Sequence, residues 1–213
     1  MTRFIVIRHG QSMSNLEGYF TGQTNTPLSP TGRKQAELTA DYILSTYKFD
    51  KVYASDLSRA YDTAKAVADR VGMEVIPHVG LREIYAGKWE GVSFKELNDT
   101  NCEAWQVWRS NVGKCRCPGG ESVAEVRERT VKTFTEIAEA NEGKTIVIGT
   151  HATVLRTLIC HCMGIDADGM KTLSWVPNAS VTVVEYDSGE LRIAVPTYDK
   201  HLEGLQSSLP SNV

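Results

Sequence analysis

Residues 3–10 read RFIVIRHG: an arginine, four apolar residues in an unbroken run, then an arginine, a histidine and a glycine. An apolar run without polar alternation predicts a short strand that is buried on both faces, as in a parallel sheet. Polar side chains that follow such a strand are expected at the edge of the sheet. Arg8 and His9 are therefore the first candidate functional residues.

Strands and helices alternate along the rest of the chain. Helices with apolar residues at intervals of three and four are predicted to begin near Ser29, at Ser55 or Asp56, at Ser122 and after His151. Further strands are predicted over residues 52–54, 74–79 and 144–149, and a terminal hairpin over 181–186 and 191–195. This alternation predicts an α/β fold with a largely parallel central sheet covered by helices on both faces.

The size and composition of the chain are those of a globular domain. It has 213 residues, of which 41% are hydrophobic and 23% charged, so it can bury a sizeable core without disulfides or a structural metal. We expect one domain over residues 1–213, with an irregular insertion or lid at about 84–121 that carries three of the four tryptophans. No apolar run approaches the roughly 20 residues that a membrane span needs.

The charge balance limits the classes of partner. A formal net charge of -3 excludes a broad basic surface for nucleic acid or anionic lipid, so any strong positive potential must be local. The five cysteines are odd in number in a chain that is not small, which favours free thiols over a secreted disulfide framework. We therefore expect a cytoplasmic protein with no nucleic-acid or membrane partner.

Cation-capable side chains follow three of the predicted strands. Arg8 and His9 come after the first strand, Arg59 lies in the first helical turn after the second, and His151 follows the strand over 144–149. Because the carboxyl ends of parallel strands meet at one edge of a sheet, we expect these side chains to lie close together. Forked arginine donors and free N–H groups at helix N-termini both match phosphate oxygens, so the pattern predicts a phosphate site.

The chemistry at this site follows from the residue types. The chain contains neither G-x-x-x-x-G-K nor G-x-G-x-x-G, so no nucleotide cradle is indicated. Two arginines and a second histidine can neutralise a phosphoryl group, so neither a metal nor a cofactor is expected. An imidazole with one free ring nitrogen is a competent nucleophile toward phosphorus. Glu83, just after a predicted strand, is the candidate acid for the leaving oxygen.

These residues stand in motifs that resemble, in content and order, those of the histidine phosphatase superfamily, which includes the cofactor-dependent phosphoglycerate mutases. The motifs cover nearly the whole chain: RHGQSMSN (8–15), FTG (20–22), LS-x-x-G (28–32), YASDLSRA (53–60), LRE (81–83), G-x-x-EG (87–91), PGGES (118–122) and His151 after a buried strand. An ordered set of this extent is far more specific than any one of its tripeptides.

The resemblance implies a three-layer α/β sandwich in which His9 becomes phosphorylated. It also implies that Arg8, Arg59 and His151 bind the transferred phosphoryl group and that Glu83 is the acid and base. Four further residues match positions that help line the phosphate or substrate pocket of the family: Ser12, Asn15, Thr21 and Gly22. Two residues depart from the family's pattern, since Gln23 stands where mutases usually have tryptophan and Ala152 follows His151 where glycine is usual.

The resemblance leaves a choice between phosphatase and mutase. A mutase must hold a second anionic group, and mutases of the family do so with paired basic residues in a longer segment after the acid. Here the basic residues after Glu83 are scattered: Lys88, Lys95, Arg109, Lys114 and Arg116. The sequence therefore favours a metal-independent hydrolase that acts on a small phosphorylated metabolite through a phosphohistidine, over a phosphoglycerate mutase. A homodimer is left open.

Two alternatives from other classes remain. The motifs Cys115-Arg116-Cys117 and Cys160-His161-Cys162 could supply a zinc site. Against it, residues 160 and 162 lie about 200° apart around a helix, so their thiols do not readily face one ion. A relative that kept the phosphate site but lost its chemistry would be a non-catalytic regulatory protein.

Overall fold

The computed structural model describes residues 1–100, 102–166 and 168–207, and within them one six-stranded sheet has the order β3-β2-β4-β1-β5-β6. The strands are β1 (Thr2–Arg8), β2 (Lys51–Ala54), β3 (Val75–Pro77), β4 (Thr145–Thr150), β5 (Val181–Asp187) and β6 (Glu190–Tyr198). The first four strands of the chain are parallel, while β5 and β6 form an antiparallel hairpin beside β1. The predicted largely parallel sheet and its terminal hairpin are confirmed.

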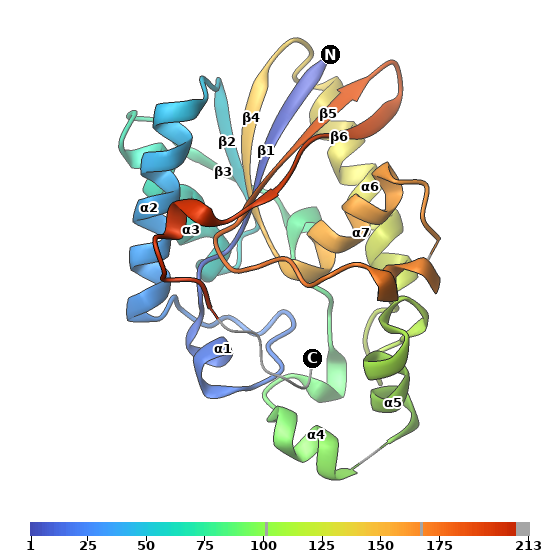
Figure 1. The fold of residues 1–213 in the computed structure, drawn as a ribbon. Helices are drawn as coiled ribbons and strands as arrows, with labels where there is room; N and C mark the ends of the chain where they lie inside the picture. Colours follow the sequence, from blue (N-terminus) through green and yellow to red (C-terminus); the bar gives the residue numbers. More distant parts are fainter. Residues whose placement is uncertain (101, 167, 208–213) are drawn as a thin grey trace.

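Helices cover both faces of the sheet, as Figure 1 shows, so the fold has three layers. One face carries α2 (Pro30–Thr46) and α3 (Ser58–Asp69), and the other carries α6 (Val123–Glu139) and α7 (Ala152–Cys162). The shorter helices are α1 (Met13–Glu17), α4 (Phe94–Thr100) and α5 (Glu103–Ser110), with 3-10 turns η1 (Val79–Leu81), η2 (Gly87–Trp89), η3 (Val112–Lys114), η4 (Asp168–Thr172) and η5 (Lys200–Leu202).

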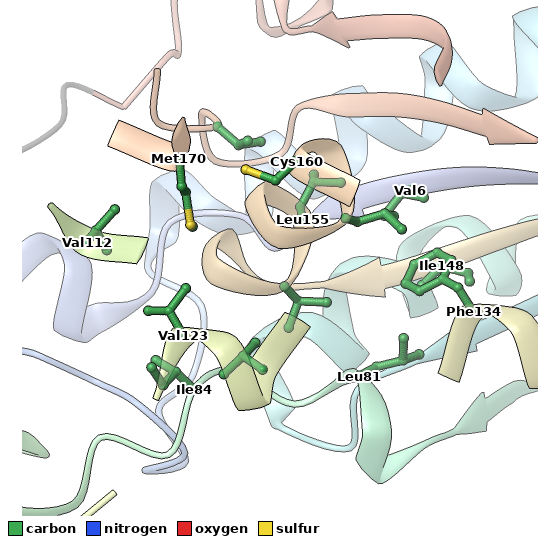
Figure 2. Packing of buried hydrophobic residues seen from close by; sticks show 14 of the residues in the cluster. Val6, Leu81, Ile84, Val112, Val123, Phe134, Ile148, Leu155, Cys160 and Met170 are labelled. Carbon is green, nitrogen blue, oxygen red and sulfur yellow. The ribbon is translucent and has the colours of Figure 1, made fainter. Parts of the chain in front are cut away.

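Alternate residues of β1 enter two separate cores. Phe4 and Val6 pack on the side of α6 and α7, where Phe134 meets Phe4 edge to face at 5.1 Å between ring centroids. Figure 2 shows Val6 and Phe134 in this core. Ile5 and Ile7 pack on the side of α2 and α3. All four apolar residues are fully buried, and each contributes roughly 1.5–3 kcal/mol of transfer free energy. This double burial explains why the run is apolar throughout, without alternation.

The loop that follows β1 is fixed by both helices of one layer. Ser29, which caps α2 by accepting from the Gly32 amide at 3.0 Å, donates to the side-chain oxygen of Gln11 at 2.7 Å. A Cβ on Gly32 would lie 2.0 Å from the Gln11 carbonyl oxygen, so glycine is needed for this close approach. The Gly10 amide donates to Thr63 of α3 at 3.1 Å. The backbone that carries His9 is thereby held from two directions.

The segment that was expected to be an irregular insertion differs from the prediction. Segment 84–121 is not irregular throughout, because it contains α4 and α5. Helices of two turns show too few apolar repeats for a readable period, and tertiary packing stabilises them instead. In α5 that packing buries Trp105 and Trp108, which are 1% and 5% exposed.

The predicted caps of α3 are wrong, and α1 has no counterpart among the predicted helices. Leu57 occupies the N-cap position of α3 without a side-chain cap bond, while Ser55 accepts from the Leu57 amide at 3.3 Å. Asp56 instead accepts from Arg82 at 2.7 Å and so ties the end of β2 to the segment before Glu83. The capping box predicted at Ser122 is present at the start of α6.

Candidate active site

The strand β1 delivers Arg8 and His9 to the carboxyl edge of the sheet. Its register with β4 sets Arg8 opposite Thr150, and the His9 amide donates to the Thr150 carbonyl at 2.9 Å. Because His151 follows Thr150 directly, this register brings two imidazoles together, with ring centroids 5.1 Å apart. The pairing of two parallel strands therefore builds the centre of the pocket.

The His9 ring has a defined tautomer. Its Nδ1 lies 2.7 Å from the Gly10 carbonyl oxygen, and a carbonyl can only accept, so the ring proton resides on Nδ1 and donates to Gly10. The pKa of His9 is lowered well below its usual value, first by burial and then by the charges of Arg59 and Arg8. At neutral pH the ring is uncharged and Nε2 carries the free lone pair that a nucleophile needs.

Arg8 and Arg59 are buried positive charges that lack a carboxylate partner within hydrogen-bond distance among the described residues. Arg8 donates to the Val176 carbonyl, and Arg59 donates to the carbonyls of Gly22 at 2.7 Å and Thr24 at 3.0 Å. Burial lowers the pKa of each guanidinium to about 10, so both remain charged at neutral pH. Two such charges lining one pocket form an anion site, because burying an unpaired charge is costly until an anion binds.

His151 occupies the N-cap position of α7 and is fully buried, and neither of its ring nitrogens has a hydrogen-bond partner among the residues that the structure describes. Burial is the main cause that lowers its pKa well below the usual value, followed by the charge of Arg59. It is not among the residues that line the pocket, and it packs edge to face against His9. An unpartnered buried imidazole next to a nucleophile is suited to donate to a ligand oxygen.

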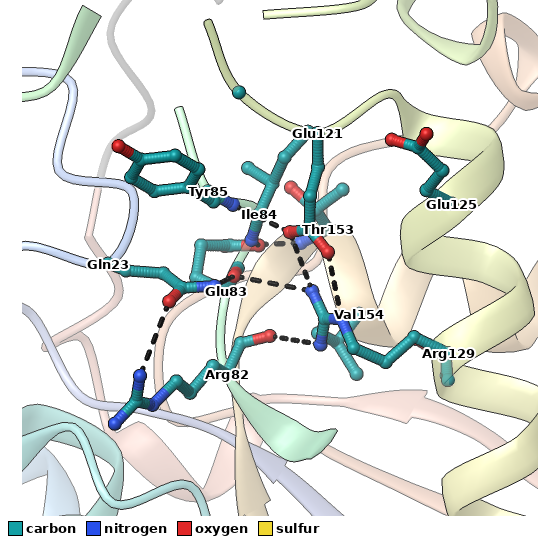
Figure 3. Close-up of polar contacts among 12 residues, drawn as sticks. Gln23, Arg82, Glu83, Ile84, Tyr85, Glu121, Glu125, Arg129, Thr153 and Val154 are labelled. Atoms are coloured by element: carbon teal, nitrogen blue, oxygen red, sulfur yellow. Dashed lines mark hydrogen bonds and ion pairs between the residues drawn. The ribbon is translucent and has the colours of Figure 1, made fainter. Parts of the chain in front are cut away.

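Glu83 also lines the pocket, and two backbone amides hold its carboxylate. One oxygen accepts from the Ile84 amide at 2.8 Å and the other from the Thr153 amide, in the first turn of α7, at 3.3 Å. The carboxylate is thus fixed between its own loop and a helix N-terminus (Figure 3).

A second set of contacts holds the backbone of Glu83, and sequence reasoning missed it. Arg129 of α6 donates to the carbonyls of Arg82 at 2.8 Å and Glu83 at 3.4 Å, and its guanidinium pairs with Glu121 at 3.0 Å (Figure 3). Gln23 also donates to the Glu83 carbonyl, at 3.1 Å. Arg129, Glu121 and Gln23 therefore form a clamp on the segment that presents Glu83.

The predicted pocket residues divide into two groups. Asn15, Thr21 and Gly22 line the pocket. Ser12 does not: it is fully buried, and its side chain accepts from the Asn15 amide at 3.1 Å as the N-cap of α1. Ser12 therefore supports Asn15, because the cap fixes the helix turn that carries the asparagine.

Asn178 is a further pocket residue that the sequence pattern did not indicate. Its side-chain amide donates to the His9 carbonyl at 3.0 Å and to the Asn15 side-chain oxygen at 3.3 Å. The lining also includes five aromatic residues, which are Tyr19, Phe20, Phe94, Trp108 and Trp175. None of these residues stands at a predicted strand end, and only their packing brings them to the site.

Neither a cluster of metal-ligating side chains nor a membrane-spanning helix is present among the residues that the structure describes. No three His, Cys, Asp or Glu side chains there lie close enough to hold a metal ion, so the zinc alternative has no donor set in that part of the chain. The five cysteines are free thiols. None of the helices described is long and apolar enough to cross a membrane.

Known proteins are similar to this chain in sequence and in fold. A family model described as histidine phosphatase superfamily, branch 1, matches residues 4–198. Phosphoserine phosphatase 1 of Hydrogenobacter thermophilus is 31% identical over 187 residues, which cover 88% of each chain. The structure of YhfR from Bacillus stearothermophilus superposes on this chain with a TM-score of 0.89 and is 27% identical in sequence. The structure of a phosphoserine phosphatase mutant from Entamoeba histolytica, in complex with phosphoserine, superposes with a TM-score of 0.83 and is 30% identical. Both superpositions cover 95% of this chain and 100% of the matched chain.

We expect the stability of the protein to fall between pH 7 and pH 5. The folded state keeps His9 and His151 neutral, whereas the unfolded chain binds protons below their usual pKa of 6.5, so acid favours unfolding. Each histidine can contribute up to about 1.4 kcal/mol per pH unit in this window. Urea unfolding of the protein and of a His9→Asn, His151→Asn double variant, at pH 7.5 and pH 5.5, measures the effect.

The double variant is expected to lose much of the pH dependence. His161 and His201, whose pKa values burial also lowers, are retained in both proteins and provide a common background. An equal pH dependence in the two proteins would contradict the assignment of neutral, buried imidazoles.

Proposed function

The chain belongs to the histidine phosphatase superfamily, and on that premise we propose that it hydrolyses small phosphomonoesters through a phosphohistidine at His9. It is a phosphatase, as are the relatives it matches over 88% of its length. The observation that carries the proposal is a neutral His9 whose Nδ1 donates to Gly10, in one pocket with two buried arginines that have no carboxylate within hydrogen-bond distance among the described residues.

The first step transfers the phosphoryl group to the protein. His9 Nε2 forms a bond to phosphorus while the bond from phosphorus to the leaving oxygen breaks, and Glu83, in its protonated form, gives its proton to that oxygen. Arg8, Arg59 and His151 donate to the three equatorial oxygens, on which the negative charge is spread in the transition state. Asn15, Thr21 and Gly22 line the space around the substrate.

The second step regenerates the protein. Water attacks phosphorus, the Glu83 carboxylate accepts a proton from that water, and the bond between phosphorus and Nε2 breaks to release inorganic phosphate. Glu83 is then protonated again, as the next cycle requires. The two steps use only residues of this chain, the substrate and one water molecule.

A mutase reaction is less well supported. It requires a second phosphate site, yet Arg8 and Arg59 are the cationic side chains among the described lining residues, and both are needed by the transferred group. Arg82, close by in the sequence, is already paired with Asp56. The odd number of cysteines supports a reducing compartment, and the net charge of -3 argues against a nucleic-acid partner.

The test of function is turnover of p-nitrophenyl phosphate and a panel of sugar phosphates in EDTA. We expect the native protein to release phosphate and His9→Asn to lose at least about a thousandfold in kcat. His161→Asn, which alters a histidine outside the pocket, serves as the control. Turnover that survives in His9→Asn would exclude this nucleophile, and a native protein without turnover would favour the regulatory alternative. Isomerisation of 3-phosphoglycerate that depends on 2,3-bisphosphoglycerate would indicate a mutase.

The clamp on Glu83 gives a second prediction. Glu83→Gln should slow the hydrolysis of alkyl phosphates about 10²–10⁴-fold and slow that of p-nitrophenyl phosphate much less, because nitrophenolate leaves without a proton.

Arg129→Lys should also slow the hydrolysis of alkyl phosphates more than that of p-nitrophenyl phosphate, but by a smaller factor than Glu83→Gln. The reason is that lysine cannot hold several carbonyls and Glu121 at once.

Arg116→Lys is the matched control for this clamp, because Arg116 pairs with Glu125 on the exposed surface. It should leave both activities unchanged. Thermal unfolding of each variant checks that the fold is retained. If Arg129→Lys slowed both classes of substrate equally, Arg129 would have no specific role in positioning the acid.

A further inference from the structure

The pocket continues beyond the phosphoryl site into a wall of aromatic side chains. The aromatic wall consists of Tyr19, Phe20, Phe94, Trp108 and Trp175. Phe94 and Trp175 are half-buried and Tyr19 is exposed, so their rings keep surface that a ligand can cover. The wall lines the same pocket as His9 and Glu83.

The aromatic wall is held in place before any substrate binds. The Arg156 guanidinium stacks on the Trp175 ring at 4.4 Å and donates to the carbonyls of Met170 at 3.1 Å and Leu173 at 3.0 Å. Trp108 lies 6.4 Å from Trp175 between ring centroids. A wall fixed in this way binds a ligand with little loss of side-chain entropy.

Among the described residues that line this pocket, no cationic side chain remains for an ionised leaving group. Of its described lining residues, Arg8 and Arg59 are the cations, and both serve the phosphoryl group. Arg156 lies beneath Trp175 and is 3% exposed. Residues 101, 167 and 208–213 include no Lys or Arg, so none of them can add a cation. A carboxylate or second phosphate on the alcohol would lose its hydration without gaining a partner, which is costly.

We propose that the aromatic wall binds the alcohol part of the substrate and that the preferred substrates are monophosphates of uncharged alcohols with an apolar face. Flat or cyclic groups of this kind stack favourably on aromatic side chains. The inference rests on the proposed phosphatase function and adds its substrate class. It also separates this chain from relatives named for phosphoserine, whose alcohol carries a carboxylate and an ammonium group.

The test compares kcat/KM for 2-phenylethyl phosphate and glucose 6-phosphate with kcat/KM for phosphoserine and 3-phosphoglycerate. We expect kcat/KM for at least one of the phosphates of uncharged alcohols to exceed the values for phosphoserine and 3-phosphoglycerate by about tenfold or more. The ammonium group of phosphoserine makes its ester oxygen the better leaving group, so leaving-group reactivity alone would favour phosphoserine. A preference for the uncharged alcohols therefore reflects binding of the alcohol. Equal or faster hydrolysis of phosphoserine or 3-phosphoglycerate would overturn the inference.

Variants of the wall identify the residue responsible. Trp175→Ala should lower kcat/KM for 2-phenylethyl phosphate by about tenfold and for methyl phosphate by no more than about twofold, because methyl phosphate does not reach the wall. Trp175→Phe should restore most of the loss. Tyr85→Ala removes an exposed aromatic ring outside the pocket and is the control. An equal loss on both substrates, in a variant with native thermal unfolding, would contradict the role of Trp175.

These experiments distinguish a failure of the proposed function from a failure of the proposed substrate class. A native protein that hydrolyses none of the monophosphates overturns the proposed function itself. A native protein that hydrolyses them all through His9, without preference for uncharged alcohols, overturns only the substrate class.

Discussion

The hydrogen bond from His9 Nδ1 to the Gly10 carbonyl, in a pocket held positive by Arg8 and Arg59, is the interaction on which the chemistry depends. It fixes the ring proton on one nitrogen and leaves Nε2 free. Burial and the two guanidiniums lower the pKa of His9, so the ring stays neutral. In the proposed mechanism, the same two charges attract the phosphoryl group that this ring attacks. One electrostatic arrangement would then both prepare the nucleophile and bind the electrophile.

The fold maintains this arrangement because the residues around it are fixed by the backbone. The register of β1 with β4 sets His9 beside His151, and α2 and α3 hold the loop that follows. On the opposite side, Arg129 links α6 to the segment that presents Glu83. A site assembled from strand ends and helix termini needs little reorganisation when the substrate binds, which is what electrostatic stabilisation of a transition state requires.

The central part of the site could be predicted from the sequence because its residues follow buried strands. Arg8, His9 and His151 have this placement, and the topology of a parallel sheet brings them together. Arg129 could not be predicted, since it lies within α6, where an arginine has the pattern of a solvent-facing residue. The aromatic wall and the helices α4 and α5 depend on tertiary packing, of which two short turns give no periodic signal. Ser12 shows what a resemblance to a family motif does not predict. Its position matches one that lines the pocket in the family, whereas its side chain here caps α1.

The most direct measurement of the central claim is the position of the phosphoryl group on the trapped intermediate. Protein quenched in alkali during turnover, then digested and analysed by ³¹P NMR against both phosphohistidine isomers, identifies the ring nitrogen that carries phosphorus. The expected result is phosphorus on Nε2 of His9, because Nδ1 is occupied by its bond to Gly10. Phosphorus on Nδ1, or on a residue other than His9, would contradict the account.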